Sequence, residues 1–161
     1  MGTRSVTIIQ EQDGKEICRI YRQYDGYPRG AGKELAMFCN RIIINGIRLD
    51  AEGPGNYGER FSNGMGELAA QLVAKWKNEH PVGNIYLQPP TGEFSEYVDY
   101  TYVIRCKTGE QPTLECFGLD DDPPYAMGKH IFGGTSKEWI EWLNKPEDKV
   151  TVDDIHAAIV K

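Results

Sequence analysis

An Asp-Gly pair near the amino end restricts the fold more than any other feature of this 161-residue chain. Asp13-Gly14 separates Ser5–Gln10 from Lys15–Arg22, and both flanking stretches are rich in residues that favour strands. Asp-Gly between two such stretches favours a tight turn with positive φ angles. The chain is therefore expected to begin with an antiparallel β-hairpin.

The position of the turn also sets the register of this hairpin. If the Asp-Gly pair forms the two-residue turn, Ser5 pairs with Arg22, and Arg4 lies opposite Gln23. We expect Arg4, Arg22 and Gln23 to gather at the open end of the hairpin. There the chain continues into a glycine-rich segment that precedes a helix.

Apolar periodicity predicts the remaining elements. Helical spacing predicts helices over about 32–40 and 66–78, and two capping motifs beginning at Thr135 and Thr151 predict two more. Runs of β-forming residues predict strands at 42–44, 47–49, 84–88, 96–106 and 113–117. Because strands and helices do not alternate strictly, we predict an α+β fold. It is expected to be a single domain over residues 1–161, with a largely antiparallel sheet and about four short helices.

The segment from Tyr21 to Glu34 carries a mixture of residues that a plain connector does not need. Glycines before a helix leave its first N–H groups uncovered, and with the helix dipole these groups attract an anion. Arginine suits phosphate or carboxylate through its forked donors, and tyrosine stacks on nucleobases. We predict a site for a small anionic ligand made of Arg4, Tyr21, Arg22, Gln23, Tyr24, Asp25, Tyr27, Arg29, Gly30, Gly32 and Lys33. The structural alternative pairs Arg4 and Arg22 with Asp25 or Glu34 and places the tyrosines in the core or at its rim.

A second candidate is the Gly-rich stretch 50–65, which has no helical or strand periodicity. Loops this long inside a compact domain are often functional. It ends in Asn63-Gly64-Met65, and Gly64-Met65-Gly66 repeats the G-x-G pattern of Gly30-Ala31-Gly32. One hypothesis has both helix starts facing one ligand, with Asn63, Gly64 and Met65 in the site and the loop closing over it. The alternative is that glycine stands beside both helices for steric reasons alone.

The sequence carries no signature of catalysis or of metal binding. The three histidines, at positions 80, 130 and 156, have no nucleophile or carboxylate at a characteristic spacing. Asp120-Asp121-Asp122 lacks the EF-hand spacing and indicates a solvated turn. The four cysteines form no C-x-x-C pair and are expected to be free and mostly buried. We predict no catalytic residue, no metal and no cofactor.

Charge and hydropathy limit the partners. The net charge is −6, although residues 1–33 carry a net +2, so the body of the protein is acidic. An acidic body argues against binding of extended nucleic acid. The chain has neither an apolar run of about 18 residues nor the apolar core of a signal peptide, which predicts no membrane association and a cytoplasmic location. A homodimer is compatible with the sequence, although no heptad repeat indicates it.

Three blocks of sequence resemble a family of small uncharacterised proteins from bacteriophages and bacteria. The blocks are Met1-Gly2-Thr3-Arg4-Ser5, Tyr21-Arg22-Gln23 with Asp25-Gly26-Tyr27-Pro28, and Asn63-Gly64-Met65 with Leu68-Ala69-Ala70-Gln71-Leu72. The resemblance covers the first half of the chain well and the second half loosely. It implies an origin but no assigned reaction. Members of the family often carry His in place of Ala31 and Cys near Gly66, and these departures weaken any catalytic scheme at those positions.

Three hypotheses about function remain open. The first is a non-enzymatic protein that sequesters a nucleotide-like ligand, by analogy with phage proteins that counter host defence by capturing signalling nucleotides. The second is a hydrolase or transferase acting on a phosphorylated substrate, with Asp25 or another acid of the loop as general base. The third is an inhibitor that binds a host defence protein through the acidic second half.

Overall fold

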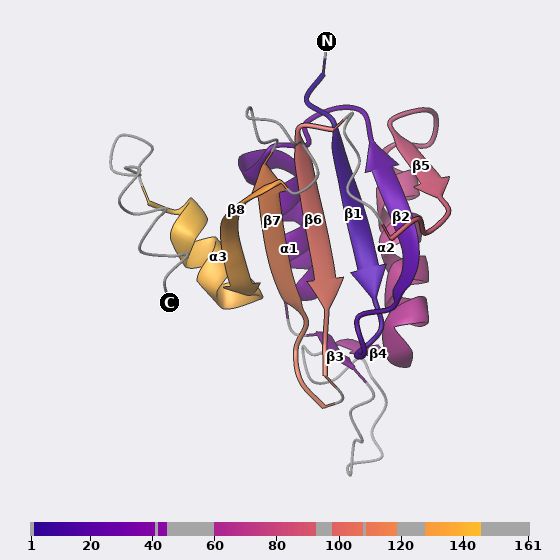
Figure 1. The fold of residues 1–161 in the computed structure, drawn as a ribbon, viewed down its shortest axis with the longest axis vertical. Coiled ribbons are helices and arrows are strands. Elements are labelled where there is room, and N and C mark those ends of the chain that lie inside the picture. The colour runs from indigo at the N-terminus through magenta and orange to yellow at the C-terminus, as the bar shows by residue number, and fades with distance from the viewer. Residues whose placement is uncertain are drawn as a thin grey trace.

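The computed structural model describes residues 2–40, 42–44, 60–92, 98–107, 109–118 and 128–145. The strands of the main sheet are β1 (Ser5–Gln10), β2 (Glu16–Arg22), β5 (Ile85–Gln88), β6 (Tyr100–Arg105), β7 (Thr113–Gly118) and β8 (Lys129–Thr135). They lie in the order β5-β2-β1-β6-β7-β8 (Figure 1). The central pair β1–β6 is parallel and the other four neighbouring pairs are antiparallel, so the sheet is mixed but largely antiparallel.

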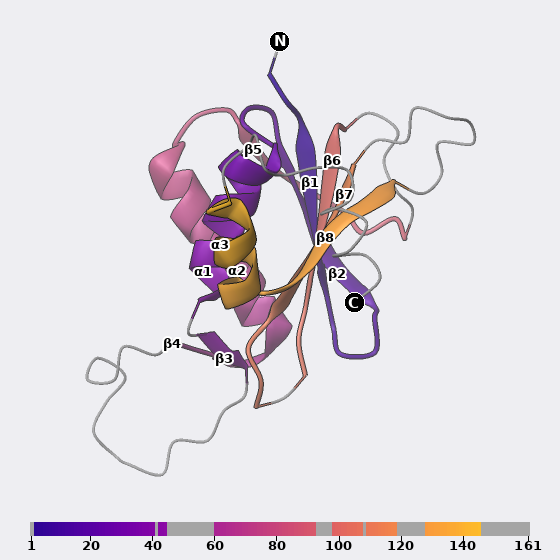
Figure 2. The ribbon, with the colours of Figure 1, turned by 90° about the vertical axis from the view of Figure 1, so that its left-hand side faces the viewer.

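The helices cover one face of this sheet. They are α1 (Lys33–Cys39), preceded by the π-helical segment η1 (Pro28–Gly32), α2 (Gly64–Glu79) and α3 (Ser136–Leu143). Figure 2 shows all three α-helices on the same side of the strands. Two short parallel strands, β3 (Ile42–Ile44) and β4 (Arg60–Ser62), lie at the end of the molecule where α2 begins (Figure 1). The arrangement is an α+β fold.

The core lies between the helices and the sheet. Ile9, Ile20 and Ile104 project from the strands, and Leu35 and Trp76 project from α1 and α2, all with no exposed surface. Their spacing explains the elements, because alternate strand residues and every third or fourth helix residue reach the same layer. Val6, Ile8 and Val103 form a smaller cluster on the opposite face of the sheet, with Val98.

The hairpin register predicted from the Asp-Gly turn is confirmed over most of its length. Ser5 pairs with Arg22 and Ile9 with Cys18, and the register shifts by one residue between Ile9 and Gln10. The Glu11 N–H donates to the Lys15 carbonyl at 2.8 Å, so the turn has three residues and the predicted two-residue turn is wrong. The predicted capping box is also present, since the Thr135 hydroxyl accepts a hydrogen bond from the Glu138 backbone N–H and the Glu138 carboxylate accepts one from that of Thr135. The four cysteines are free, and all but the half-buried Cys18 are buried.

Other expectations need correction. The stretch 50–65 was expected to be irregular, but its end forms β4, and Gly64-Met65 lies inside α2 because this helix begins two residues before the expected start. The sequence pattern gave no indication of β8, which contains Gly133-Gly134. The strand expected at 47–49, the acidic turn at 120–122 and the helix expected near Thr151 lie outside the described residues.

None of the helices in the described ranges is both long enough and apolar enough to cross a bilayer.

Candidate functional site

The connection from β2 to α1 folds back against the start of β1. The Gly26 N–H donates to the Thr3 carbonyl at 2.9 Å, and the Tyr102 hydroxyl of β6 donates to the Gly26 carbonyl at 2.7 Å. Burial raises the pKa of Tyr102 well above its ordinary value, so the phenol stays protonated and remains a donor. This buried bond fixes the loop over the end of the sheet.

The N–H groups expected to be bare are already bonded within the chain. Gly30 and Gly32 donate to the Tyr27 carbonyl at 2.9 and 3.4 Å, and Ala31 donates to the Asp25 carbonyl at 2.8 Å. The π-helical segment supplies these acceptors by wrapping one extra turn ahead of α1. An anion at this place would have to displace backbone carbonyls, so the prediction of uncovered donors is wrong.

The two glycines of this segment have steric reasons to be there. A Cβ atom on Gly30 would overlap the Asp25 carbonyl oxygen, and one on Gly32 would lie 3.1 Å from Trp139 and 3.2 Å from Tyr102. Gly32 therefore allows the chain to pack closely against two aromatic rings of the core. The G-x-G pattern is accounted for by packing.

Arg22 is part of the interior. It is 3% exposed, its Nε donates to the Tyr24 carbonyl at 2.7 Å, and Nη1 binds the carboxylate of Glu34. Its guanidinium carbon also lies 5.2 Å from the centre of the Trp76 ring. The ion pair with Glu34 agrees with the alternative prediction, in which Arg22 pairs with an acidic residue of the chain instead of a ligand.

The remaining predicted cations do not join Arg22. Tyr21, its neighbour on β2, packs with the small cluster on the opposite sheet face, so Arg22 faces the helices. Arg4 is exposed and precedes β1, and Arg29 donates to the carbonyls of Leu143 at 2.8 Å and Lys145 at 3.0 Å. Arg22 and Arg29 each have their own protein acceptors, so these two predicted cations are already engaged by the protein.

A smaller set of predicted residues does lie together, in the tetrapeptide Tyr24–Tyr27, which we name the tyrosine loop. Tyr24 is 53% exposed and Tyr27 is 40% exposed, and both flank Asp25, whose φ of 58° is unusual for a residue with a side chain. The Tyr27 hydroxyl lies 3.4 Å from Asp25 Oδ1. A Cβ atom on Gly26 would lie 2.9 Å from the Arg4 carbonyl carbon, so the Arg4 backbone lies beside this loop.

Gln23 helps to hold the tyrosine loop in place. Its side-chain oxygen accepts a hydrogen bond from the Tyr21 hydroxyl at 2.6 Å. The backbone N–H groups of Gln23 and Tyr24 donate to Asn84 Oδ1 at 3.1 and 2.8 Å. Asn84 was not predicted as part of a site, and the sequence offers no signal for it beyond its place at the start of a strand.

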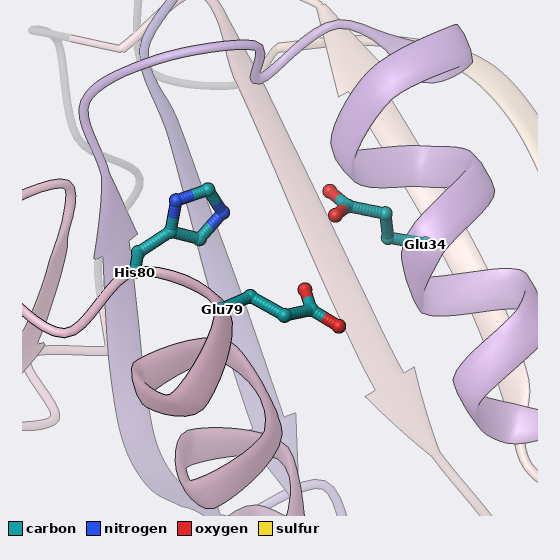
Figure 3. A group of neighbouring side chains, drawn as sticks. All are labelled: Glu34, Glu79 and His80. Carbon is teal, nitrogen blue, oxygen red and sulfur yellow. The ribbon is translucent and has the colours of Figure 1, made fainter.

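The second G-x-G lies at the other end of the molecule. Met65 is 1% exposed, and the Asn63 N–H is bound to the Glu67 carboxylate. The 16 residues of α2 span about 24 Å at 1.5 Å per residue, and the carboxyl end of this helix is the one that faces α1 (Figure 3). Asn63, Gly64 and Met65 therefore do not share a site with Gly30 and Gly32.

A cluster that sequence reasoning missed lies between α1 and the end of α2. Ligand atoms of Glu34, Glu79 and His80 all lie within 4.8 Å of one another. Figure 3 shows Glu34 reaching from the first turn of α1 toward Glu79 and His80. The adjacent Glu79 and His80 offered a weak signal, but their partner is far away in the sequence.

A comparison with protein-family models, with curated proteins and with solved structures finds no match. The resemblance to the phage and bacterial family therefore stays a prediction.

Proposed function

We propose that the protein binds a small anionic, nucleotide-like ligand without transforming it, and that the tyrosine loop is the contact surface. The observation that carries the proposal is the exposure of Tyr24 and Tyr27, at 53% and 40%, on either side of Asp25. Tyrosine is enriched where a protein contacts a partner, because its ring is apolar and its hydroxyl is polar. Two tyrosine rings at the surface offer stacking faces for a nucleobase.

Positive charge for such a ligand comes from Arg4 and Lys33. Both are exposed, and within the described ranges no hydrogen bond or ion pair engages either side chain. The Arg4 backbone adjoins Gly26, and Lys33 is the first residue of α1. Exposed cations suit a phosphate or carboxylate, and using these two leaves Arg22 and Arg29 in their structural bonds.

The resemblance to phage proteins gives this activity a biological setting. A non-enzymatic protein that captures a nucleotide signal would deprive a host defence system of its messenger. In that setting the protein acts in the host cytoplasm and needs no cofactor. This part of the proposal rests on the resemblance and on analogy.

The first test is a thermal-shift screen against nucleotides, cyclic dinucleotides and ADP-ribose derivatives, because a ligand that binds only the folded state raises the melting temperature. For a hit, Tyr24→Ala and Tyr27→Ala should each lower the affinity about 5- to 100-fold, the loss expected from one stacking contact. The matched control is Tyr86→Ala, since Tyr86 is 52% exposed on β5 and should leave the affinity unchanged. Equal losses in all three variants would contradict a site at the tyrosine loop.

The fate of the ligand and the effect of Asp25→Asn distinguish binding from catalysis. Mass spectrometry of the ligand recovered after denaturation should return it unchanged. If product forms instead, and Asp25→Asn abolishes turnover while affinity survives, the hydrolase or transferase hypothesis replaces the present one.

Asp25→Gly tests whether the strained backbone of the tyrosine loop serves binding. Glycine adopts a φ of 58° without strain, so the unfolding free energy should rise by about 0.5–1 kcal/mol. The affinity for the ligand should fall if the Asp25 carboxylate accepts hydrogen bonds from the ligand. Chemical denaturation measures the unfolding free energy, and calorimetry measures the affinity for the ligand. A loss of stability would contradict the assignment of strain.

One observation favours a protein partner as the second candidate. Val82, Tyr86 and Leu87 are 92%, 52% and 67% exposed, and the last two belong to β5, at the edge of the main sheet. An edge strand can accept a strand from another protein. This surface differs from the acidic second half that the sequence suggested. Leu87→Lys should then abolish capture of the partner, whereas Tyr24→Ala should not.

A further inference from the structure

We propose that Glu34, Glu79 and His80 form a binding site for a divalent transition-metal ion of the Zn²⁺ class. Their ligand atoms lie within 4.8 Å of one another and come from two different helices (Figure 3). The proposal does not depend on the ligand proposed for the tyrosine loop, because it uses none of that loop's side chains.

The donor set suits zinc. One imidazole nitrogen and two carboxylate oxygens are ligands that Zn²⁺ takes, and three protein ligands leave a fourth position for water or another molecule. Bonds of about 2.1 Å hold tetrahedral ligands about 3.4 Å apart, so separations of up to 4.8 Å must close by at most about 1.4 Å. Glu34 is 31% exposed and Glu79 is 36% exposed, and side chains that reach solvent have room for this adjustment.

A buried polar atom without a partner in the described chain, on the helix that carries Glu79, is a second observation. Trp76 is fully buried, and its indole N–H has no acceptor among the described residues. Trp76 lies one helical turn before His80, whose N–H donates to the Trp76 carbonyl at 2.8 Å. Its ring also faces the guanidinium that binds Glu34, at 5.2 Å.

Ser5 adds a second such atom on the sheet side. Its hydroxyl is fully buried and has no partner in the described part of the chain. Ser5 pairs with Arg22 in the β1–β2 register, so it lies on the strand next to the arginine that binds Glu34. Buried polar groups normally find a partner, and these two belong to residues that adjoin the arginine that binds Glu34.

Existing ion pairs favour zinc over magnesium or calcium. Arg22 binds one oxygen of Glu34, and Lys75 Nζ lies 2.5 Å from Oε1 of Glu79, so each carboxylate keeps its second oxygen. The two bases cancel the charge of the two acids. Mg²⁺ and Ca²⁺ depend on several charged oxygens, whereas Zn²⁺ gains from the neutral imidazole.

The experiment is calorimetric titration of the reduced full-length protein with Zn²⁺, Mg²⁺ and Ca²⁺ separately. Zn²⁺ should bind one to one, and the other two ions much more weakly. His80→Gln and Glu79→Gln should each lower Zn²⁺ affinity by about tenfold or more, because even an outer-sphere partner is worth about 10- to 100-fold. Lys75→Met should raise the affinity about fivefold by removing a competing cation.

The matched control is His130→Gln. His130 also contacts a carboxylate, with Nε2 at 2.5 Å from Glu115 Oε2, but within the described ranges it belongs to no cluster of three ligands. This variant should bind Zn²⁺ like the wild type. The double variant Tyr24→Ala, Tyr27→Ala should do so as well, which distinguishes a failure of this site from a failure of the tyrosine loop.

Cobalt substitution identifies the ligands. Co²⁺ in this site should give weak visible bands without the intense near-ultraviolet band of a thiolate ligand. Thermal unfolding of each variant without metal confirms that it folds. Absence of saturable Zn²⁺ binding, equal affinity in His80→Gln and His130→Gln, or a thiolate band would overturn the proposal.

Discussion

The two G-x-G segments predict stability changes of opposite sign when their glycines become alanine. A Cβ atom on Gly30 would overlap the Asp25 carbonyl oxygen, which is also the acceptor for the Ala31 N–H at 2.8 Å. A Cβ atom on Gly66, inside α2, would meet no atom within 4 Å outside the adjoining turns of its own helix. The same substitution therefore meets backbone at one position and open space at the other.

The magnitudes follow from these surroundings. At Gly30, overpacking should lower the free energy of unfolding by about 1–3 kcal/mol and a weakened hydrogen bond by about 1 kcal/mol. Alanine also reduces the conformational entropy of the unfolded chain, which offsets about 0.5–1 kcal/mol of this loss. The net loss is about 2 kcal/mol, which lowers the melting temperature by about 4–8 °C for a chain of this size. At Gly66, the higher helix propensity of alanine should add about 1 kcal/mol and raise it by about 2–4 °C.

Thermal unfolding followed by circular dichroism measures both changes, and urea unfolding with an unchanged m-value shows that the native state stays compact. The result that would refute the reasoning is a Gly30→Ala variant as stable as the wild type that has lost ligand binding. In that case the glycine would serve a ligand, and the packing account of the first G-x-G would be wrong.

Three further predictions concern the interior and its edges. Glu34→Gln should lower the unfolding free energy by about 2 kcal/mol in urea titrations, because Arg22 is 3% exposed and would lose its charged partner. Thr135→Ala removes the cap of α3 and should cost about 1 kcal/mol by the same measurement; a cost near zero would mean that the cap contributes nothing in water. Iodoacetamide at pH 8 followed by mass spectrometry should modify the half-buried Cys18 first and leave Cys116 intact until the protein is denatured, since burial raises the pKa of the Cys116 thiol. Early labelling of Cys116 would contradict its burial.

Local rules were enough for the parts of the fold that local residues decide. The Asp-Gly pair places the turn closely enough to predict the pairing of Ser5 with Arg22, because the one-residue register shift between Ile9 and Gln10 offsets a turn of three residues. The capping box at Thr135 is similarly contained within four residues. Both predictions needed no knowledge of the rest of the chain.

Long-range pairing could not be read from the sequence. β1 and β6 are parallel neighbours, with Ser5 opposite Tyr100, and nothing near either strand specifies that partner. β8 was missed because Gly133 is uncharacteristic of a strand, yet a Cβ atom there would overlap the Glu115 carboxylate on β7. The glycine is required by the neighbouring strand, and a sequence-based rule sees only its low strand propensity.

The candidate site shows the same division. The hairpin register was enough to predict that Arg4 lies beside the segment that contains the tyrosine loop. Arg22 was assigned to the ligand because an arginine near glycines suits an anion, but its carboxylate partner Glu34 lies on α1 and its stacking partner Trp76 on α2. The charge of a side chain predicts which ligands it can bind. A buried charged side chain, however, is normally paired with another group of the protein and is then not free for a ligand.

Two residues at the tyrosine loop have positive φ angles, and the fold explains only one of them. Among the described residues, Asp25 and Asn84 are the non-glycine residues with positive φ, at 58° and 60°. The fold explains Asn84, because its side-chain oxygen accepts two backbone N–H groups, and glycine there would lose both bonds. It does not explain Asp25 in this way, since its carboxylate accepts only a 3.4 Å contact from Tyr27 within the described chain. A strained residue whose side chain contributes little to the fold is the one whose replacement can separate binding from stability.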